Sequence, residues 1–131
     1  MPAIAIQKGV RISPRKVAVV AALVRGRSVE DAITILEYTP RRAALSVKEA
    51  IKSAAANAEH NHSYKPGTLE ITEISVMAGP RLKRFIPAAR GRARRFQRKT
   101  SHIRVVVDGQ LREIKKVNRS EKPATAAKET K

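Results

Sequence analysis

The feature that most constrains this chain is a stretch between Ser75 and Val107 that holds ten Lys or Arg residues and no Asp or Glu. Acidic residues stand on both sides of it, at Glu73 and Asp108, so the gap is local and does not reflect the whole chain. Ten like charges repel one another and add nothing to the stability of a folded domain by themselves. A polyanion is expected to compensate them, and the stretch therefore indicates a nucleic-acid partner.

Composition sets the class of protein. The 131 residues carry a formal charge of +17, and the 42% of apolar residues suffice for one core. Aromatic residues make up only 3%, which argues against base-stacking platforms and favours recognition of phosphates and RNA shape. The absence of cysteine excludes disulfides, thiol catalysis and Cys-ligated zinc. No signal peptide is visible and the longest apolar run, 17–24, is too short for a bilayer, so we expect a cytoplasmic protein without a membrane partner.

Capping residues and helical spacing predict three helices in the first half. Ser13-Pro14 starts the first helix, and Gly26 follows its end in the position of a left-handed residue. Ser28, with Asp31 three residues later, caps the second helix. Thr39-Pro40 ends that helix and is predicted to open a third, which runs to about His60. The apolar positions expected in the core are Val17, Val20, Ala21, Val24, Val29, Ala32, Ile33, Leu36, Ala44, Val47, Ile51, Ala54 or Ala55, and Ala58.

Alternating apolar residues predict strands at 3–6, at 69–77 and at 103–107, the last ended by Asp108-Gly109. The apolar register of 69–77 switches midway, which either a bulge or a change of buried face would explain. Residues 110–117 are a possible further short strand. We expect one domain over residues 1–116 and a disordered tail over 117–131.

The basic segment 80–100, called the arm below, lies between two of these strands. The simplest connection is antiparallel, which makes a long hairpin of about residues 79–104 that projects on the order of 30 Å. An isolated two-stranded hairpin is marginal in water, so the arm should become ordered only against a partner. Pro80 and Pro87 remove amide donors, and small residues around Gly91 form a narrow tip. The alternative is a disordered basic segment, as most charge runs are.

Arginine makes up eight of the ten cations of the stretch, which suits bidentate phosphate contacts. A second basic set precedes Glu30 and is either a solvated helix face or a second phosphate-binding surface aided by helix N-terminal amides. Beside these, His102 is either structural or faces RNA. The predicted RNA-binding residues are Lys8, Arg11, Arg15, Lys16, Arg25, Arg81, Lys83, Arg84, Arg90, Arg92, Arg94, Arg95, Arg98, Lys99, His102 and Arg104.

Four motifs carry a resemblance to a known family. They are SPRKV at 13–17, NAEHN at 57–61, GPRLKR at 79–84, and RGRARR followed by KTSHI at 99–103. Over about residues 12–107 the chain resembles bacterial large-subunit ribosomal protein twenty-two. The resemblance implies an α+β fold of three helices packed on a small antiparallel sheet with one long protruding β-hairpin.

The same resemblance implies a function on the ribosome. The protein would bind large-subunit rRNA in several of its domains, aid assembly, and line the nascent-peptide exit tunnel with its hairpin. It implies tunnel-lining positions at Lys83, Arg84, Arg90, Gly91, Arg92 and Ala93, and an association with macrolide sensitivity and peptide-dependent stalling. The expected partners are rRNA, neighbouring ribosomal proteins and the nascent polypeptide, with no cofactor, no metal and no homo-oligomer. Arg94 and Arg95 stand where the family varies, and the tail matches no part of it.

Other classes of protein fit less well. An enzyme would need a site at Glu59-His60-Asn61-His62, but residues two apart on a helix do not share a face. A helix-turn-helix DNA reader would place 28–38 in a groove, and that segment carries three acids and no base. A membrane-surface helix conflicts with the prolines of the arm. The main alternative is a general basic RNA- or DNA-binding protein outside the ribosome.

Overall fold

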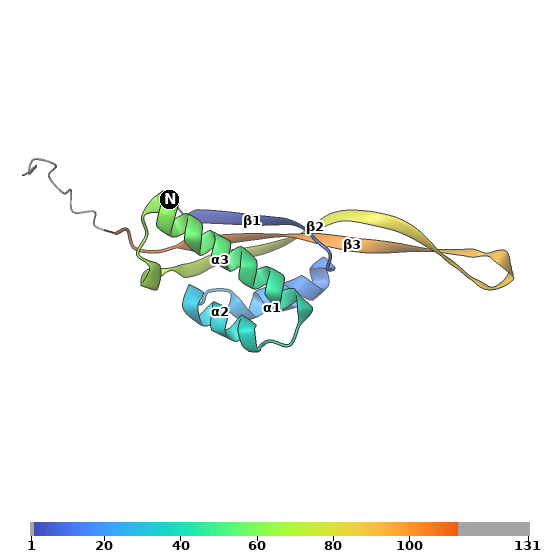
Figure 1. Ribbon diagram of the computed structural model, residues 1–131, viewed down its shortest axis with the longest axis horizontal. Coiled ribbons are helices and arrows are strands. Elements are labelled where there is room, and N and C mark those ends of the chain that lie inside the picture. The colour runs from blue at the N-terminus through green and yellow to red at the C-terminus, as the bar shows by residue number, and fades with distance from the viewer. Residues whose placement is uncertain (1, 113–131) are drawn as a thin grey trace, which may run out of the picture.

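The computed structural model describes residues 2–112, which form three helices and a three-stranded antiparallel sheet of order β1-β3-β2 (Figure 1). The predicted α+β fold with one long hairpin is confirmed. The elements in chain order are β1 (Ala3–Val10), α1 (Pro14–Val24), α2 (Val29–Tyr38), α3 (Arg42–His62), β2 (Glu70–Pro87) and β3 (Ala93–Asp108). Short 3-10 turns precede β2, at Pro66–Thr68, and join β2 to β3, at Ala89–Gly91.

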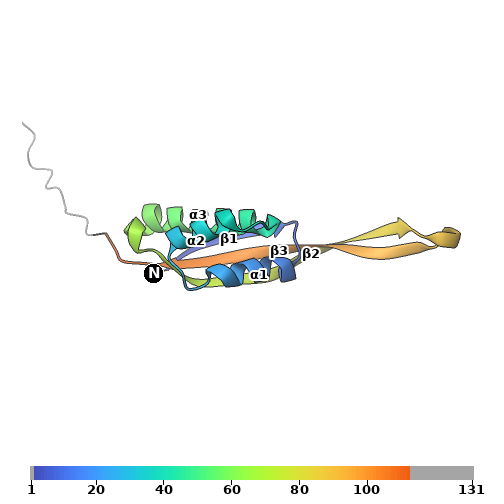
Figure 2. The same cartoon turned by 90° about the horizontal axis from the view of Figure 1, so that it is seen from below.

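The helices cover one face of the sheet, and the other face is open (Figures 1 and 2). α3 lies along β1 and β3, α1 lies along β2 and β3, and α2 packs on α3. On β1 the inward Ala3 and Ala5 are buried, whereas the outward Ile4 and Ile6 are 42% and 51% exposed. This alternation is that of an antiparallel sheet with a single packed side.

The core lies between the helices and the inner face of the sheet. Ile103, Val105 and Val107 of β3 are fully buried, as are Ile51 of α3 and Val20 of α1. Burying each such side chain contributes about 1.5–3 kcal/mol of transfer free energy. The alanines of α3 allow close approach of β1, and the side-chain amide of Asn57 donates to the Ile4 carbonyl at 3.1 Å. The predicted core positions are buried, except that Ile33 is only partly buried and that Ala54 is buried rather than Ala55.

The helix starts differ in how they are capped. The Ser28 hydroxyl accepts from the Asp31 amide at 3.2 Å and donates to the Asp31 carboxylate at 2.7 Å, which confirms the predicted cap of α2. Ser13 is the N-cap residue of α1 but makes no side-chain cap hydrogen bond. Gly26 has the predicted left-handed backbone, with φ of 69°.

The prediction that Thr39-Pro40 opens the third helix is wrong by about two residues. The Thr39 hydroxyl donates to the Ile35 carbonyl at 2.7 Å, and the Arg41 amide donates to the Thr39 carbonyl at 2.7 Å. Thr39 therefore closes α2, and α3 begins at Arg42. At its other end α3 runs to His62, where Ser63 takes a left-handed conformation.

The three strands of the described chain all extend beyond their predicted ranges, and β3 begins at Ala93 instead of at residue 103. β1 continues to Val10, which pairs with Ser101 of β3, and the Gly9 amide donates to the His102 Nδ1 atom at 3.0 Å. β2 begins at Glu70 and continues into the arm as one strand, with a register shift in its pairing between Ala78 and Arg81. The register switch in its first half is a bulge between Ile71 and Glu73, which decides between the two explanations left open by the sequence. Of the possible strand at 110–117, only a single bridge from Leu111 to Tyr64 is present, and the remainder lies outside the described residues, as does the predicted tail.

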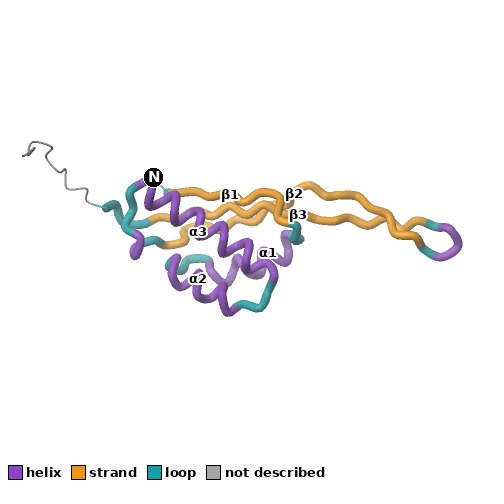
Figure 3. Tube along the Cα trace, viewed as in Figure 1, coloured by secondary structure: helices purple, strands orange, loops and turns teal. Residues whose placement is uncertain are grey.

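The arm is a two-stranded ribbon that extends far beyond the helices (Figure 3). Its pairing begins at Arg81 with Lys99 and continues to Pro87 with Ala93, so the arm is paired rather than irregular. The tip is a tight turn in which Arg90 and Gly91 have positive φ values of 59° and 68°. Two such residues in succession match the mirror-image turns that suit the twist of a hairpin. The expectation that the free arm needs a partner in order to become ordered stays a prediction.

Candidate nucleic-acid interface

Strand alternation gives the arm two different faces. One face carries Arg84, Arg94 and Arg98 among Leu82, Ile86 and Phe96, and the other carries Arg81, Lys83, Arg95 and Lys99 beside Phe85. All of these cations are exposed. Because neither face is covered by the body of the protein, the arm can be enclosed by a partner on both sides.

The cations of the arm have no carboxylate partner among the described residues. Two ion pairs occur within residues 2–112: Lys48 with Glu37 at 2.8 Å, and Arg104 with Glu73 at 4.0 Å. Both lie on the body. The arm therefore presents positive charge that no carboxylate of residues 2–112 neutralises, and its guanidinium groups suit phosphate oxygens.

Two arginines of the arm lie over phenylalanine rings. The guanidinium carbon of Arg95 is 5.8 Å from the ring centre of Phe85 across the strands, and that of Arg98 is 5.8 Å from the ring centre of Phe96. These are cation–π distances, and they place each guanidinium group next to an apolar ring. Each arginine thereby loses less freedom when it binds a phosphate.

A second basic surface lies where the arm meets the body. Three separate segments line a cavity of about 610 Å³, called the basal pocket below. They are residues 11–13 with Lys16, residues 41–43, and residues 97–99. Six of the ten lining residues are Lys or Arg and none is acidic.

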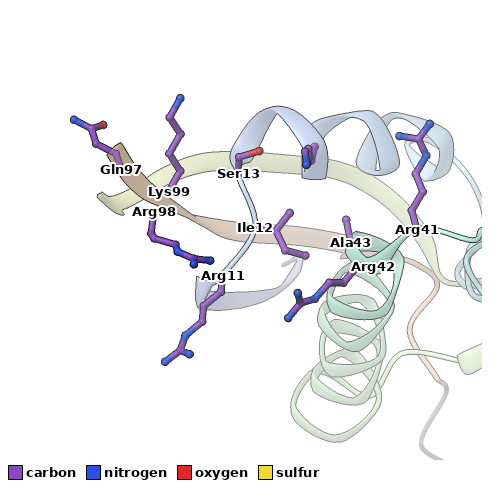
Figure 4. Close-up of a pocket in the computed structure, with 10 residues that line it drawn as sticks. Arg11, Ile12, Ser13, Arg41, Arg42, Ala43, Gln97, Arg98 and Lys99 are labelled. Carbon is purple, nitrogen blue, oxygen red and sulfur yellow. The ribbon is translucent and has the colours of Figure 1, made fainter. Parts of the chain in front are cut away.

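Figure 4 shows how these side chains lie. Arg42 extends from the start of α3 and Arg98 from β3, and the two point toward each other past Ile12, with Arg11 beside them. Arg41 and Lys99 point away toward solvent. Both α1 and α3 begin at this pocket, and neither N-terminus has a side-chain cap, so their partial positive charges add to those of the side chains.

The structure gathers some of the predicted residues and separates others. Arg11, Lys16, Arg98 and Lys99 meet in the basal pocket, although the sequence separates the first pair from the second. Lys8 and Arg15 are exposed but do not line the pocket. The remaining arm residues Arg81, Lys83, Arg84, Arg90, Arg92, Arg94 and Arg95 stand along the ribbon and its tip.

Three predicted residues make contacts within the body instead. Arg25 donates to the Ile74 carbonyl at 3.1 Å, and Arg104 pairs with Glu73. The Nδ1 atom of His102 accepts the Gly9 amide, which is the structural role that the sequence left open for it. These contacts use part of each side chain's hydrogen-bonding capacity, so the three are weaker candidates for RNA contact than the cations of the arm.

Sequence reasoning missed Arg41 and Arg42. Neither residue was among the predicted RNA-binding positions. A usable signal was present, because no acidic residue occurs between Glu37 and Glu49. Two adjacent arginines at an uncapped helix start mark an anion-binding surface more strongly than either feature alone.

Within residues 2–112, no three His, Asp or Glu side chains gather as a metal site would require. His62, from the motif weighed as an enzyme site, lies near the end of α3 with its ring centre 6.1 Å from that of Tyr64. None of the described helices is long and apolar enough to cross a membrane.

Comparison with known proteins supports one family. Residues 5–108 match the family described as ribosomal protein L22p/L17e. Proteins named large ribosomal subunit protein uL22 are 52% identical in Desulforamulus reducens and 51% identical in Clostridium tetani, each over 107 residues. A protein of the same name in Herpetosiphon aurantiacus is 50% identical over 108 residues. The alignments cover 82% of this chain and 95–96% of these relatives.

Proposed function

Because the chain belongs to the ribosomal protein L22p/L17e family, and is thus a structural constituent of the large ribosomal subunit, we propose that it acts by binding rRNA through its arm and its basal pocket. The observation that carries the proposal is the arm itself, a paired ribbon whose exposed cations have no carboxylate partner among the described residues. Crowded phosphates of folded RNA supply the compensating charge. The role is one of scaffolding, not of catalysis.

The body and the arm divide this task. The body, with its core between helices and sheet, sits on the surface of the subunit beside neighbouring ribosomal proteins. The arm threads between RNA segments of different domains and holds them together, which aids assembly. A two-stranded ribbon suits this task because it exposes side chains on both faces and is only two chains wide.

We also propose that the tip of the arm lines the exit tunnel for the nascent polypeptide. Lys83, Arg84, Arg90, Gly91, Arg92 and Ala93 would face or approach the tunnel. The tight turn at Arg90 and Gly91, with exposed alanines around it, supports the proposal because such a tip fits a confined space. A photoreactive residue in place of Arg92 should crosslink to a stalled nascent chain, whereas the same residue in place of Lys52 on α3 should not. Equal crosslinking from both positions would contradict the tunnel assignment.

Co-sedimentation tests the rRNA proposal. The full-length protein should sediment with the large subunit and be released by ribonuclease digestion. Retention after digestion would mean that protein contacts alone hold it, against the proposal. The alternative, a general nucleic-acid-binding protein outside the ribosome, predicts that most of the cellular protein is found off the subunit and that unrelated RNA competes equally well.

A further inference from the structure

The basal pocket lies where the arm leaves the body and is lined by residues of both. Arg11 and Lys16 belong to the loop and first turn after β1, Arg42 belongs to α3, and Arg98 and Lys99 belong to the root of the arm. The cavity of about 610 Å³ between them is far larger than one water molecule needs and has room for more than one phosphate group.

The charges of the pocket are uncompensated. Its six cations take part in neither of the two ion pairs found within residues 2–112. Like charges around one cavity repel each other, more strongly where protein displaces water. A bound anion with several negative charges would attract all of these cations. It would thereby replace the repulsion between the arm and the body with a net attraction.

The junction has few other constraints. Pairing of β1 with β3 ends at Val10 with Ser101, and beyond that point β3 is paired only with β2. A register shift between Ala78 and Arg81 interrupts β2 at the same level. The Ser101 hydroxyl donates to the Ile12 carbonyl at 3.0 Å, and this bond ties β3 to the loop of the body. Beyond the two continuous strands and the hydrogen bond from the Thr100 hydroxyl to the Pro80 carbonyl, this bond to the loop is thus a main contact that sets the direction of the arm relative to the body.

We propose that the basal pocket is a site for two or more neighbouring phosphates of one RNA strand, and that their binding braces the arm against the body. Arg98 would contact the phosphates from the arm while Arg11 and Arg42 contact them from the body. The identification of the anion as RNA rests on the proposed function. The pocket thereby fixes the angle at which the arm enters the RNA.

Inorganic pyrophosphate, which joins two phosphates in one small ion, tests the site on the isolated full-length protein. Calorimetric titration should show saturable binding that Arg11→Gln with Arg42→Gln weakens about tenfold or more, because each loses a charge-assisted hydrogen bond. The matched control is Arg94→Gln with Arg95→Gln, which removes the same charge from exposed arm positions outside the pocket. The control should bind like the unaltered protein. Equal weakening of both variants, or no saturable binding, would overturn the site.

The brace is tested by a distance distribution. The chain has no cysteine, so spin labels can be placed at Lys52→Cys on α3 and Ala89→Cys at the tip without further changes. Saturating pyrophosphate should narrow the distribution of distances between the labels, and Arg11→Gln with Arg42→Gln should abolish the narrowing. A distribution that stays equally broad with pyrophosphate bound would overturn the brace.

Failure of this inference is distinguishable from failure of the proposed function. Both experiments use pyrophosphate and no ribosome, whereas the proposed function is tested by ribonuclease-sensitive co-sedimentation. A protein that co-sediments normally but binds no pyrophosphate refutes the pocket and leaves the proposed function standing.

Discussion

Among single residues, Gly79 allows the close approach of the two strands at the root of the arm. A Cβ atom at this position would lie 2.5 Å from the Thr100 hydroxyl oxygen and 3.2 Å from the Thr100 carbonyl carbon. The same hydroxyl donates to the Pro80 carbonyl at 2.7 Å across the two strands. Glycine thus allows β2 and β3 to approach closely where the ribbon leaves the sheet.

Gly79→Ala should therefore destabilise the protein by about 1–3 kcal/mol, the usual cost of an overpacked contact. Urea unfolding measures this change. Gly67→Ala is the matched control, because a Cβ atom there would meet nothing within 4 Å. If the two variants unfold at the same urea concentration, the contact at Gly79 does not constrain the strands.

Single residues also show what the sequence could predict. The start of α2 could be predicted from Ser28, because a helix cap involves residues only three positions apart, and its hydrogen bond with Asp31 is local. The acid-free run around Arg42 marks it as part of a basic surface, but not as part of this pocket, because its neighbours there lie 31 residues before it and 56 residues after it, at Arg11 and Arg98. A site assembled from distant segments becomes visible only once the fold is known.

Among the elements, α2 and α3 are joined by the pair of Lys48 with Glu37. The hydrogen bond from Lys48 and its charge hold the pKa of the Glu37 carboxyl below its ordinary value of 4.5. A carboxyl whose pKa is lower in the folded state stabilises the fold above its unfolded pKa, and the stabilisation is lost as the pH falls through the folded value.

Glu37→Gln should consequently reduce the free energy of unfolding slightly at neutral pH, and the difference from the unaltered protein should vanish in acid below the lowered pKa. Urea unfolding at a series of pH values measures the difference. The effect should be small and should shrink with added salt, because the pair is at the surface. A difference that persists unchanged at the lowest pH would mean that the variant acts through something other than the charge of Glu37.

The stability of the core does not depend on the arm. From Arg81 to Lys99 no side chain is fully buried, and Phe96 is the only one that is partly covered. Removing Leu82 to Arg84 together with their partners Phe96 to Arg98 shortens both strands equally and keeps them paired.

This paired deletion should leave the unfolding of the body within about 1 kcal/mol of the full-length protein, since it removes little buried apolar surface. Thermal or urea unfolding followed by helical circular dichroism is the measurement. Loss of a cooperative transition in the shortened protein would show that the arm stabilises the core, and would contradict the claim that the core is stable independently of the arm.

The strands were harder to predict than the helices for a physical reason. The alternation at 103–107 was visible because one face packs in the core. In the arm, cations occupy both faces of the ribbon, so the period of two disappears from the hydrophobicity pattern. The sequence could therefore predict that a long hairpin connects the strands, but not that β2 extends to Pro87 and that β3 begins at Ala93.

At the level of the whole molecule, the charge of +17 is distributed unevenly. The acidic residues of the described chain and both of its ion pairs lie in the body. The charged residues of the arm and of the basal pocket are all Lys or Arg. A folded body thus carries a polycationic ribbon whose charge must be neutralised by its partner. Binding that neutralises phosphates releases counterions and depends steeply on salt.

The salt dependence of RNA binding tests this account most directly. If about six side chains contact phosphate, a plot of the logarithm of affinity against that of salt concentration has a slope of roughly −5, and affinity falls about a thousandfold between about 50 and 200 mM salt. Replacing Arg94, Arg95 and Arg98 with Gln should reduce the magnitude of the slope by about 3. Replacing the exposed Lys52 and Lys65 of the body with Gln should leave it unchanged. A slope near zero, or equal changes in both variants, would contradict the claim that the arm binds RNA through phosphates.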